Sequence, residues 1–539
     1  MISRTPLIGA LIIAIVTAQA SALNTQAYAQ TAQLGALTFP NSGAKKAQAD
    51  FIDGVLYLHS FEYEPARKAF QRAQQIDPSF ALAYWGEAMT HHHSLWDRQR
   101  PDLGAAALQK FGLTPQERAQ KTPTERERGL MNAVETVFGL TEASTGKSKL
   151  ERDVLYREKM RQLYENYPGD HEIAAFYGLS ILGVGSANRT YASYMRAAAV
   201  ILPIWDDNKL HPGAAHYLIH SFDDPVHAIL GLPMADAYIK IAPDAAHAQH
   251  MTSHIYTALG HWDDVVAANL RGFVVESAKT TDTDVMSKEE RHYTYWLIYG
   301  RLQQGRWEDA RKLLAKMRGR LDDSATGPER AYYGAIIARY MFDTEDWNVF
   351  DKWGAPATMD IPTAHYNFAR AFAAIKRGDI KAAKSFAKDI KPGGDGNPEI
   401  FLTEGEVEIL QLELKAMIAL AKGKKKSAVS LMREAEAMGR RLPFKYGPPR
   451  LSKPTNELLG DVLAEVGDHE LAVEAYQDEL ENSLRRTNSL LGLARAAAEH
   501  GDHPTANDAY KQLTEIWHNA DTSLTFTDEA RAAGGPQKK

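Results

Sequence analysis

A 34-residue period near the C-terminal end constrains the fold of this chain more than any other feature. The recurring residues are Gly467, Asp468, His469, Ala472 and Tyr476, matched 34 positions later by Gly501, Asp502, His503, Ala506 and Tyr510. A unit of this length cannot bury its apolar face alone and must stack on its neighbours. The sequence therefore predicts a solenoid of repeats rather than a single layered domain.

Near the other end of the chain, Gly54, Tyr57, Ala66, Phe70, Ala73 and Pro78 fall at the spacings of the 34-residue tetratricopeptide pattern. Small residues allow two antiparallel helices to approach closely, and aromatic residues fill the space between neighbouring hairpins. Between the two ends, a glycine followed five residues later by an alanine recurs at Gly305/Ala310, Gly378/Ala383 and Gly423/Ala428. The pattern resembles that of tetratricopeptide repeat (TPR) proteins over most of residues 45 to 520. This resemblance implies an all-α fold, a tetratricopeptide-like α-solenoid of antiparallel helix pairs.

The match to the repeat is uneven, and this unevenness predicts the domain organisation. Residues 97–150 fit poorly, because Pro101, Pro115 and Pro123 interrupt the helical pattern, and we expect an insertion there. The predicted segments are a signal peptide over 1–29, N-terminal TPR hairpins over 45–96, the irregular insertion over 97–150, histidine-rich TPR-like repeats over 151–283, divergent TPR-like repeats over 284–440, C-terminal TPR repeats over 441–525 and a disordered tail over 526–539.

The N-terminal residues predict export. Arg4 precedes an apolar run, Pro6–Ala20, and small-residue sites follow at Ala20-Ser21-Ala22 and Ala27-Tyr28-Ala29. This order is typical of a cleaved signal peptide, and the run is short for a spanning helix, which needs about 20 apolar residues. We expect a periplasmic or secreted protein with no membrane span in the mature chain; an uncleaved anchor is the alternative.

Composition and motifs exclude several classes of function. The net charge of -6 gives no basic surface for nucleic acid, so no nucleic-acid partner is expected. The chain has no cysteine, which excludes disulfides, thiol catalysis and covalent haem attachment. It also lacks a phosphate-binding loop, a Gly-x-Ser-x-Gly elbow and a His-Glu-x-x-His helix. No catalytic residue can be assigned from these patterns.

The main functional signal is a double coincidence of histidine spacing. His216 and His220 are four residues apart, as are His250 and His254, and the two pairs are separated by 34 residues. Four residues place two side chains on one face of a helix, and one repeat places the two pairs at matching positions in neighbouring helices about 10 Å apart. We expect the four imidazoles to converge in the concave groove, with His247 as a possible addition.

Imidazoles that converge in this way favour a divalent transition metal. Histidine is the commonest metal ligand, and without cysteine the suitable ions are copper, zinc, nickel or iron. Asp223 lies a turn beyond His220 and can complete the set or orient an imidazole through its second nitrogen. The alternative is that these histidines only form hydrogen bonds in the groove and were duplicated together with the repeat.

Other histidines give weaker signals. His91, His92 and His93 are consecutive, so at most two of them can share a site, and a position at the end of a helix explains them. His59 lies near the turn of the first repeat and is a weak candidate.

The segment from His211 to Trp262 also resembles a group of exported bacterial histidine-rich TPR proteins, which share the phrases His-Pro-Gly-Ala-Ala-His-Tyr and His-x-x-His-Met-x-Ser-His-Ile. The resemblance extends to Tyr446-Gly-Pro-Pro449 and assigns no reaction. We expect a scaffold that binds a protein or peptide in its concave groove and also binds a divalent metal through the histidine cluster. The alternative is a periplasmic metalloenzyme that uses the same histidines and keeps a coordination position open. The fold alone does not choose between them.

Overall fold

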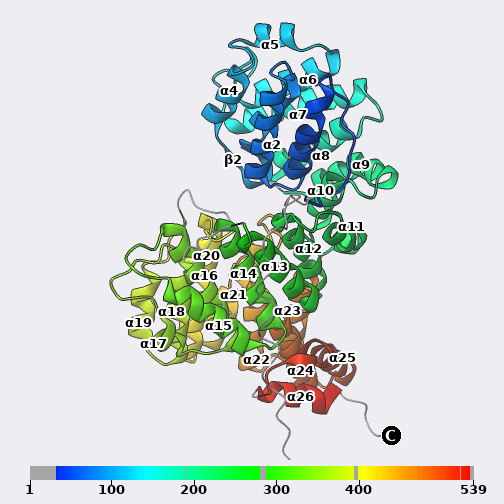
Figure 1. The fold of residues 1–539 in the computed structure, drawn as a ribbon. Helices are drawn as coiled ribbons and strands as arrows, with labels where there is room; N and C mark the ends of the chain where they lie inside the picture. The colour runs from blue at the N-terminus through cyan, green and yellow to red at the C-terminus, as the bar shows by residue number, and fades with distance from the viewer. Residues whose placement is uncertain (1–31, 187–188, 280–286, 394–398, 523, 535–539) are drawn as a thin grey trace, which may run out of the picture. The chain divides into compact units, whose positions relative to one another are not determined.

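The structure is a computed structural model that describes residues 32–186, 189–279, 287–393, 399–522 and 524–534. Within these residues the chain forms 26 α-helices, three short 3-10 helices (Lys45–Ala47, Ser94–Trp96 and Trp517–Asn519) and one pair of two-residue strands, β1 (His92–His93) and β2 (Arg98–Gln99). The predicted all-α fold is confirmed: the chain is a tetratricopeptide-like α-solenoid in which consecutive helices pack as antiparallel pairs (Figure 1).

The first half of the described chain contains thirteen helices. They are α1 (Gln48–His59), α2 (Tyr63–Ile76), α3 (Ala81–Met89), α4 (Pro101–Gln109), α5 (Pro115–Lys121), α6 (Glu125–Val137), α7 (Lys149–Asn166), α8 (His171–Gly185), α9 (Tyr191–Asp207), α10 (Pro212–Phe222), α11 (Ala228–Ile241), α12 (Ala246–Leu259) and α13 (Trp262–Ser277).

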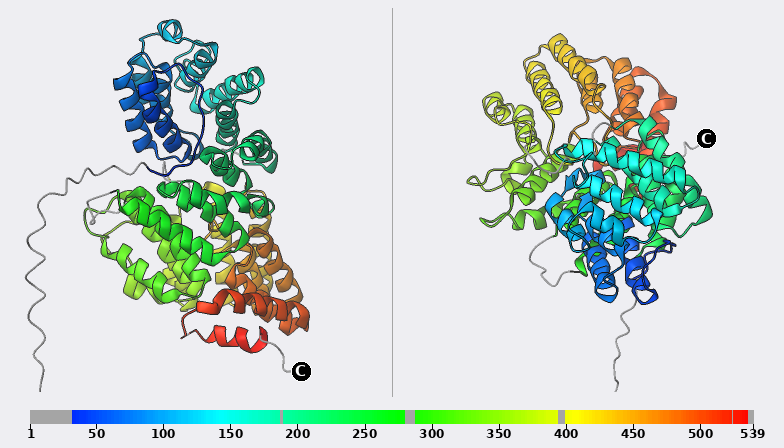
Figure 2. Two further views of the ribbon diagram at one scale, coloured as in Figure 1. Left: turned by 45° about the vertical axis from the view of Figure 1, so that its right-hand side comes forward. Right: turned by 90° about the horizontal axis from the view of Figure 1, so that it is seen from above.

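The second half also contains thirteen helices, and Figure 2 shows the later ones stacked side by side from yellow to red. They are α14 (Lys288–Gln303), α15 (Trp307–Gly319), α16 (Gly327–Thr344), α17 (Val349–Trp353), α18 (Ala364–Lys376), α19 (Ile380–Ala387), α20 (Glu404–Ala421), α21 (Lys425–Gly439), α22 (Thr455–Val466), α23 (His469–Asn482), α24 (Thr487–His500), α25 (His503–Ile516) and α26 (Thr525–Gly534).

One packing rule explains the repeat at the N-terminal end. The ring of Phe70 on α2 lies between Gly54 on α1 and Gly86 on α3, each 16 residues away in sequence. A Cβ atom at Gly54 or Gly86 would meet this ring at 2.7 Å or 2.4 Å, which is closer than atoms pack. The two glycines are therefore required by the aromatic ring that joins one hairpin to the next.

The same rule holds at the C-terminal end. Tyr476 on α23 lies between Gly460 on α22 and Gly492 on α24, again 16 residues away on either side. Cβ atoms at these glycines would meet the ring at 2.7 Å and 2.3 Å. The repeat recognised from sequence is thus a repeated arrangement of one aromatic ring and two glycines.

Two predicted segments contain more helix than expected. The segment 97–150 contains α4, α5 and α6, and the prolines begin helices rather than breaking them: Pro101 and Pro115 occupy the first turns of α4 and α5. In the tail 526–539, residues up to 534 belong to α26, because the Phe526 ring packs 5.0 Å from that of Trp307 and 4.7 Å from that of Trp517. Residues 535–539 lie outside the described part.

The predicted signal peptide over 1–29 also lies outside the described residues. Among the helices that are described, none is both long enough and apolar enough to cross a membrane.

The packing rule predicts the effect of a single methyl group. Gly86→Ala places a Cβ against Phe70 and should lower the free energy of unfolding by about 1–3 kcal/mol through overpacking. Gly319→Ala is the control, because a Cβ there meets nothing within 4 Å, and its effect should stay within about 0.5 kcal/mol. Urea denaturation followed by circular dichroism measures both; equal stabilities for the two variants would contradict the rule.

Candidate metal centre

Two neighbouring first helices, α10 and α12, position the histidine cluster. Pro212 occupies the first turn of α10, and the ring of His211 caps this helix by accepting a hydrogen bond from the backbone N–H of Ala214 (3.1 Å). Because α10 contacts α12 directly, the faces carrying His216 and His220 on α10 and His247, His250 and His254 on α12 meet.

Three of these imidazoles converge. One ring nitrogen each from His216, His220 and His247 lies within 4.8 Å of the other two. The Nε2 atom of each ring is buried and has no hydrogen-bond partner among the described residues. A buried polar atom left without a partner costs free energy, so three together point to a ligand that these nitrogens bind.

Hydrogen bonds behind the rings of His216 and His254 fix which nitrogen of each ring carries the lone pair. The Nδ1–H of His216 donates to the backbone carbonyl oxygen of His59 (2.6 Å), so its Nε2 carries a lone pair. The Nδ1–H of His254 donates to Oδ2 of Asp223 (3.0 Å), and Nδ1 of His220 lies 3.6 Å from the same oxygen. Metal-binding histidines are typically oriented in this way by a carbonyl or carboxylate.

Asp223 has the role of an orienting carboxylate. It is buried at the C-terminal end of α10, and its other oxygen forms an ion pair with Arg189. Burial alone would raise the pKa of Asp223, but the Arg189 guanidinium and the hydrogen bonds from His220 and His254 hold it well below its usual value. Asp223 is therefore ionised and accepts hydrogen bonds from the imidazoles.

The four histidines predicted from their spacing do not form one group. His216 and His220 join His247, whereas His220 and His254 meet at Asp223 in a second group. His250 belongs to neither: its Nδ1–H donates to Oδ1 of Asn269 (2.7 Å), and its Nε2 lies 2.8 Å from Nε2 of His292.

The cluster is enclosed rather than lining an open groove, which was the expectation from sequence. The exposed fraction of His216 and His250 is 0 %, and that of His247 is 8 %. Phe61 covers the His216 ring with centroids 4.4 Å apart, and Trp296 stacks on His254 at 4.6 Å. Aromatic rings therefore close the site on two sides.

Burial sets the charge of the imidazoles. It lowers the pKa of His216, His247 and His250 well below 6.5, with repulsion from neighbouring histidines adding to it. Burial also lowers the pKa of His254 to about 4, although Asp223 opposes the shift. Neutral imidazoles are the form that binds metal, so these rings are ready to bind at neutral pH.

A third group, His59, Glu172 and His211, is buried but fully hydrogen-bonded. Glu172 accepts from Nε2 of His59 (2.9 Å) and from Nε2 of His211 (3.1 Å), and Nδ1 of His59 meets the hydroxyl of Tyr217 at 2.9 Å. Burial alone would raise the pKa of Glu172, but the two histidines hold it at about 2. With every ring nitrogen paired, we interpret this group as a support for the first.

The consecutive histidines are not part of the unpartnered group, although the Trp96 ring contacts both His93 and His247. They follow α3 rather than ending it, and His92 and His93 form β1. The ring of His93 stacks on Tyr63 with centroids 3.8 Å apart, and His92 lies 3.8 Å from a carboxylate oxygen of Asp153. Packing and hydrogen bonding account for them.

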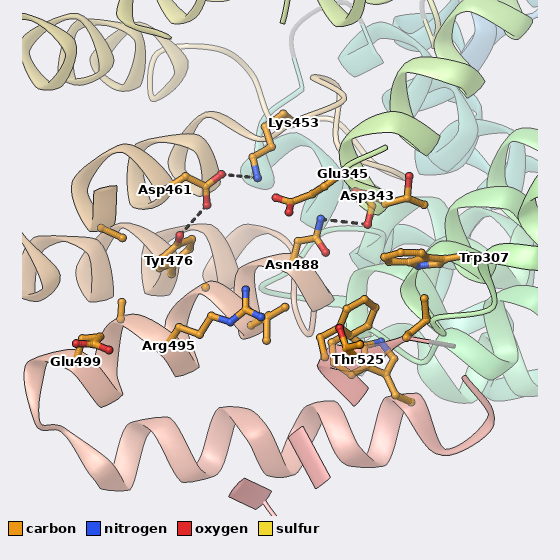
Figure 3. Close-up of a pocket in the computed structure, with 18 of the residues that line it drawn as sticks. Trp307, Asp343, Glu345, Lys453, Asp461, Tyr476, Asn488, Arg495, Glu499 and Thr525 are labelled. Atoms are coloured by element: carbon orange, nitrogen blue, oxygen red, sulfur yellow. Dashed lines mark hydrogen bonds and ion pairs between the residues drawn. The ribbon is translucent and has the colours of Figure 1, made fainter. Parts of the chain in front are cut away.

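Cavities lie in two parts of the described chain. One of about 530 Å³ reaches Asp223 and is lined by the segment that contains Phe444 and Lys445. The other, of about 490 Å³, is lined mostly by the C-terminal repeats and by no histidine of the cluster. Figure 3 shows Lys453 and Tyr476 both reaching Asp461 there, at 2.7 Å each.

Sequence reasoning missed His292, Asn269, Glu399 and Arg189. His292 lies on α14, 42 residues after His250, so a search for a 34-residue spacing passes over it. Glu399 accepts a hydrogen bond from Nδ1 of His292 (2.7 Å) and follows a segment with no repeat signal. Tyr446, whose ring lies 4.9 Å from that of His254, belongs to the Tyr446-Gly-Pro-Pro449 phrase that the sequence did single out.

Comparison with known proteins gives solved helical structures but no family. No family model and no curated protein matches the sequence. The chain is similar to the Cut9–Hcn1 hetero-tetramer of the APC/C (10 % identity, 91 % of this chain and 77 % of that chain, TM-score 0.33). It is similar to an IFIT1 monomeric mutant with Gppp-AAAA (12 % identity, 88 % of this chain and 97 % of that chain, TM-score 0.34). It is also similar to yeast Tom70 (12 % identity, 91 % of this chain and 95 % of that chain, TM-score 0.26). Matches at this level say nothing of ligand or partner.

The neutral histidines predict acid lability. Burial lowers the pKa of His92 and His365 to about 3, whereas in the unfolded chain it is about 6.5. The unfolded state therefore binds more protons below pH 6.5, and stability falls as the pH drops toward the folded values. Each such histidine should lower the free energy of unfolding by about 2 kcal/mol between pH 6.5 and pH 5.

Urea denaturation of the metal-free protein at pH 7.5 and pH 5 measures this loss. His365→Gln should reduce the pH dependence by about one group, and His500→Gln, at an exposed histidine that ends α24, should leave it unchanged. A stability that is equal at both pH values would contradict the account.

Proposed function

We propose that this protein is an exported helical-repeat protein that binds a divalent transition metal through His216, His220 and His247. One observation carries the proposal: a ring nitrogen from each of these three histidines lies within 4.8 Å of the other two, and the buried Nε2 atom of each ring has no partner among the described residues. The His59 carbonyl oxygen, bonded to Nδ1 of His216, and Asp223, 3.6 Å from Nδ1 of His220, serve as the outer ligand shell. His254 and His250, predicted as ligands from their spacing, surround this group.

The ion is expected to be zinc, copper, nickel or iron. Neutral imidazole suits all four ions, and no thiolate is available to favour softer metals. Three nitrogens within 4.8 Å fit N–metal bonds of about 2.0–2.1 Å after a small inward movement of the rings.

A metalloenzyme is the second candidate function. Three protein ligands leave a coordination position open, as in catalytic zinc sites, whereas structural sites use four. The cavity of about 530 Å³ supports this alternative, because Asp223, the carboxylate beside the cluster, is among its lining residues. A water whose pKa is lowered by the bound metal would be the nucleophile in such an enzyme.

The scaffold function is proposed for the C-terminal repeats. The cavity of about 490 Å³ is lined by the first helices α22 and α24, the face that the TPR resemblance turns inward. Lys453, Arg495 and Glu345 give this cavity charges of both signs, which suits the backbone and side chains of an extended peptide. Export rests on the signal-peptide pattern alone, and N-terminal sequencing of the mature protein tests it.

Removing one ligand should abolish stoichiometric metal binding. His247→Ala should weaken the affinity for Zn²⁺ by more than the 10–100-fold expected for an outer-shell change such as Asp223→Asn. Calorimetric titration of tag-free, metal-stripped protein measures the affinity, and elemental analysis after desalting measures the stoichiometry.

The matched control is His211→Asn. Asparagine keeps a good helix cap at the start of α10 but removes a nitrogen from the His59, Glu172 and His211 group. This variant should bind Zn²⁺ like the parent. If His211→Asn loses the metal and His247→Ala keeps it, the hydrogen-bonded group is the metal site and the proposal is wrong.

A further inference from the structure

His250 and His292 present their Nε2 atoms to each other at a separation of 2.8 Å. His250 lies on α12, and His292 lies on α14, the first helix of the next hairpin. The two rings meet at the edge of the cluster. His250 is fully buried, whereas the side chain of His292 is 25 % exposed.

In the neutral forms of both rings, the two nitrogens at this contact carry lone pairs. Oδ1 of Asn269 accepts the Nδ1–H of His250, and the orientation of this amide is set because its Nδ2 donates to the Val265 carbonyl oxygen (2.8 Å). The Glu399 carboxylate accepts the Nδ1–H of His292 (2.7 Å). A neutral imidazole has one ring proton, so with Nδ1 protonated in both rings no proton remains for a hydrogen bond between the Nε2 atoms.

The distance between the ring centres shows whether this contact is a straight hydrogen bond. In a head-on N–H···N bond of 2.8 Å, with about 1.15 Å from ring centre to nitrogen, the ring centres would lie about 5.1 Å apart. The observed centroid separation is 4.4 Å, with the ring planes at 69°. The contact is therefore bent, and the two Nε2 atoms do not both point straight at each other.

A metal ion placed beside the two nitrogens fits this bent contact. Two nitrogens 2.8 Å apart, each about 2.05 Å from an ion, subtend about 86° at it, and the ring centres would then lie about 4.4 Å apart. An angle near 90° is the one between neighbouring ligands in square-planar or octahedral coordination, and it is smaller than the tetrahedral angle that Zn²⁺ prefers.

We propose that His250 and His292 form a second metal position, distinct from the His216, His220 and His247 group, that takes Cu²⁺ or Ni²⁺. Asn269 and Glu399 orient the two ligands, as outer-shell acceptors do at histidine metal sites. Water fills the remaining coordination positions on the exposed side of His292. The position lies next to His254, whose ring centre is 5.3 Å from that of His250.

Copper titration of the tag-free, metal-stripped full chain tests this position. The parent should retain two equivalents of Cu²⁺ after desalting, and His292→Phe should retain one. His247→Ala should also retain one equivalent of Cu²⁺, bound at the second position. The electron paramagnetic resonance spectrum of this variant should show a tetragonal Cu²⁺ ion with two imidazole nitrogens. Asn269→Leu removes an orienting acceptor and should weaken the second equivalent by about 10–100-fold.

The matched control is His171→Phe, at a histidine whose side chain is 30 % exposed and pairs with Asp207. This variant should retain both equivalents. Circular dichroism and the copper retained at the first group show that His292→Phe is folded.

The outcomes separate the two proposals. If His292→Phe binds copper like the parent while His247→Ala loses an equivalent, the second position does not exist and the first stands. If His292→Phe loses one equivalent and His247→Ala loses none, the second position stands and the first is wrong. A tetragonal signal that persists unchanged in His292→Phe would also overturn the second position, because the copper would then be bound elsewhere.

Discussion

Three imidazoles of the cluster, those of His216, His250 and His254, are each held from behind by an acceptor, and the chemistry of the site depends on those hydrogen bonds. The His59 carbonyl oxygen holds His216, Asp223 holds His254, and Asn269 holds His250. With each Nδ1 protonated, each Nε2 carries the lone pair that a metal needs. Without these acceptors the rings could change tautomer and pair with one another, and the site would become a hydrogen-bonded core.

The acceptors are themselves products of the repeat stacking. His59 ends α1, so its carbonyl oxygen is one that the helix leaves unpaired, and stacking brings it to His216 on α10. Asp223 ends α10 and remains ionised because Arg189 lies against it. The solenoid thus places helix ends and buried charges around the imidazoles, which an isolated helix pair could not do.

Burial sets the protonation state of the histidines and lowers the stability of the metal-free fold in acid. Enclosure by Phe61 and Trp296 keeps the histidines neutral, which prepares them for metal and makes the metal-free fold sensitive to acid. A bound ion would satisfy the Nε2 atoms of His216, His220 and His247 and would stabilise the folded state by mass action. Metal binding and stability are therefore expected to be coupled.

The sequence predicted the fold and the helices of the site well, because the repeat is a local pattern. The spacing of Gly54, Phe70 and Gly86 reports a contact between successive hairpins, and the same contact recurs at Tyr476. The four-residue spacing placed His216 and His220 on one face of α10. These inferences needed only helical geometry and one period.

The grouping of the histidines could not be predicted in the same way. His247 rather than His254 completes the unpartnered group, because the outcome depends on which ring Asp223 takes up as a hydrogen-bond donor. His292 is brought to His250 by a hairpin whose spacing differs from the repeat, and Glu399 is brought to His292 by a contact 107 residues away in sequence. Tertiary packing sets these contacts, and no period in the sequence records them.

A crystal structure of the metal-loaded protein, with anomalous diffraction collected on both sides of the absorption edge of the metal, tests the central claim most directly. The account predicts an anomalous peak about 2.0–2.1 Å from the Nε2 atoms of His216, His220 and His247, with Nδ1 of His216 still bonded to the His59 carbonyl oxygen. A peak at the His59, Glu172 and His211 group instead, or water molecules bonded to all three Nε2 atoms in protein that holds no metal after loading, would contradict it.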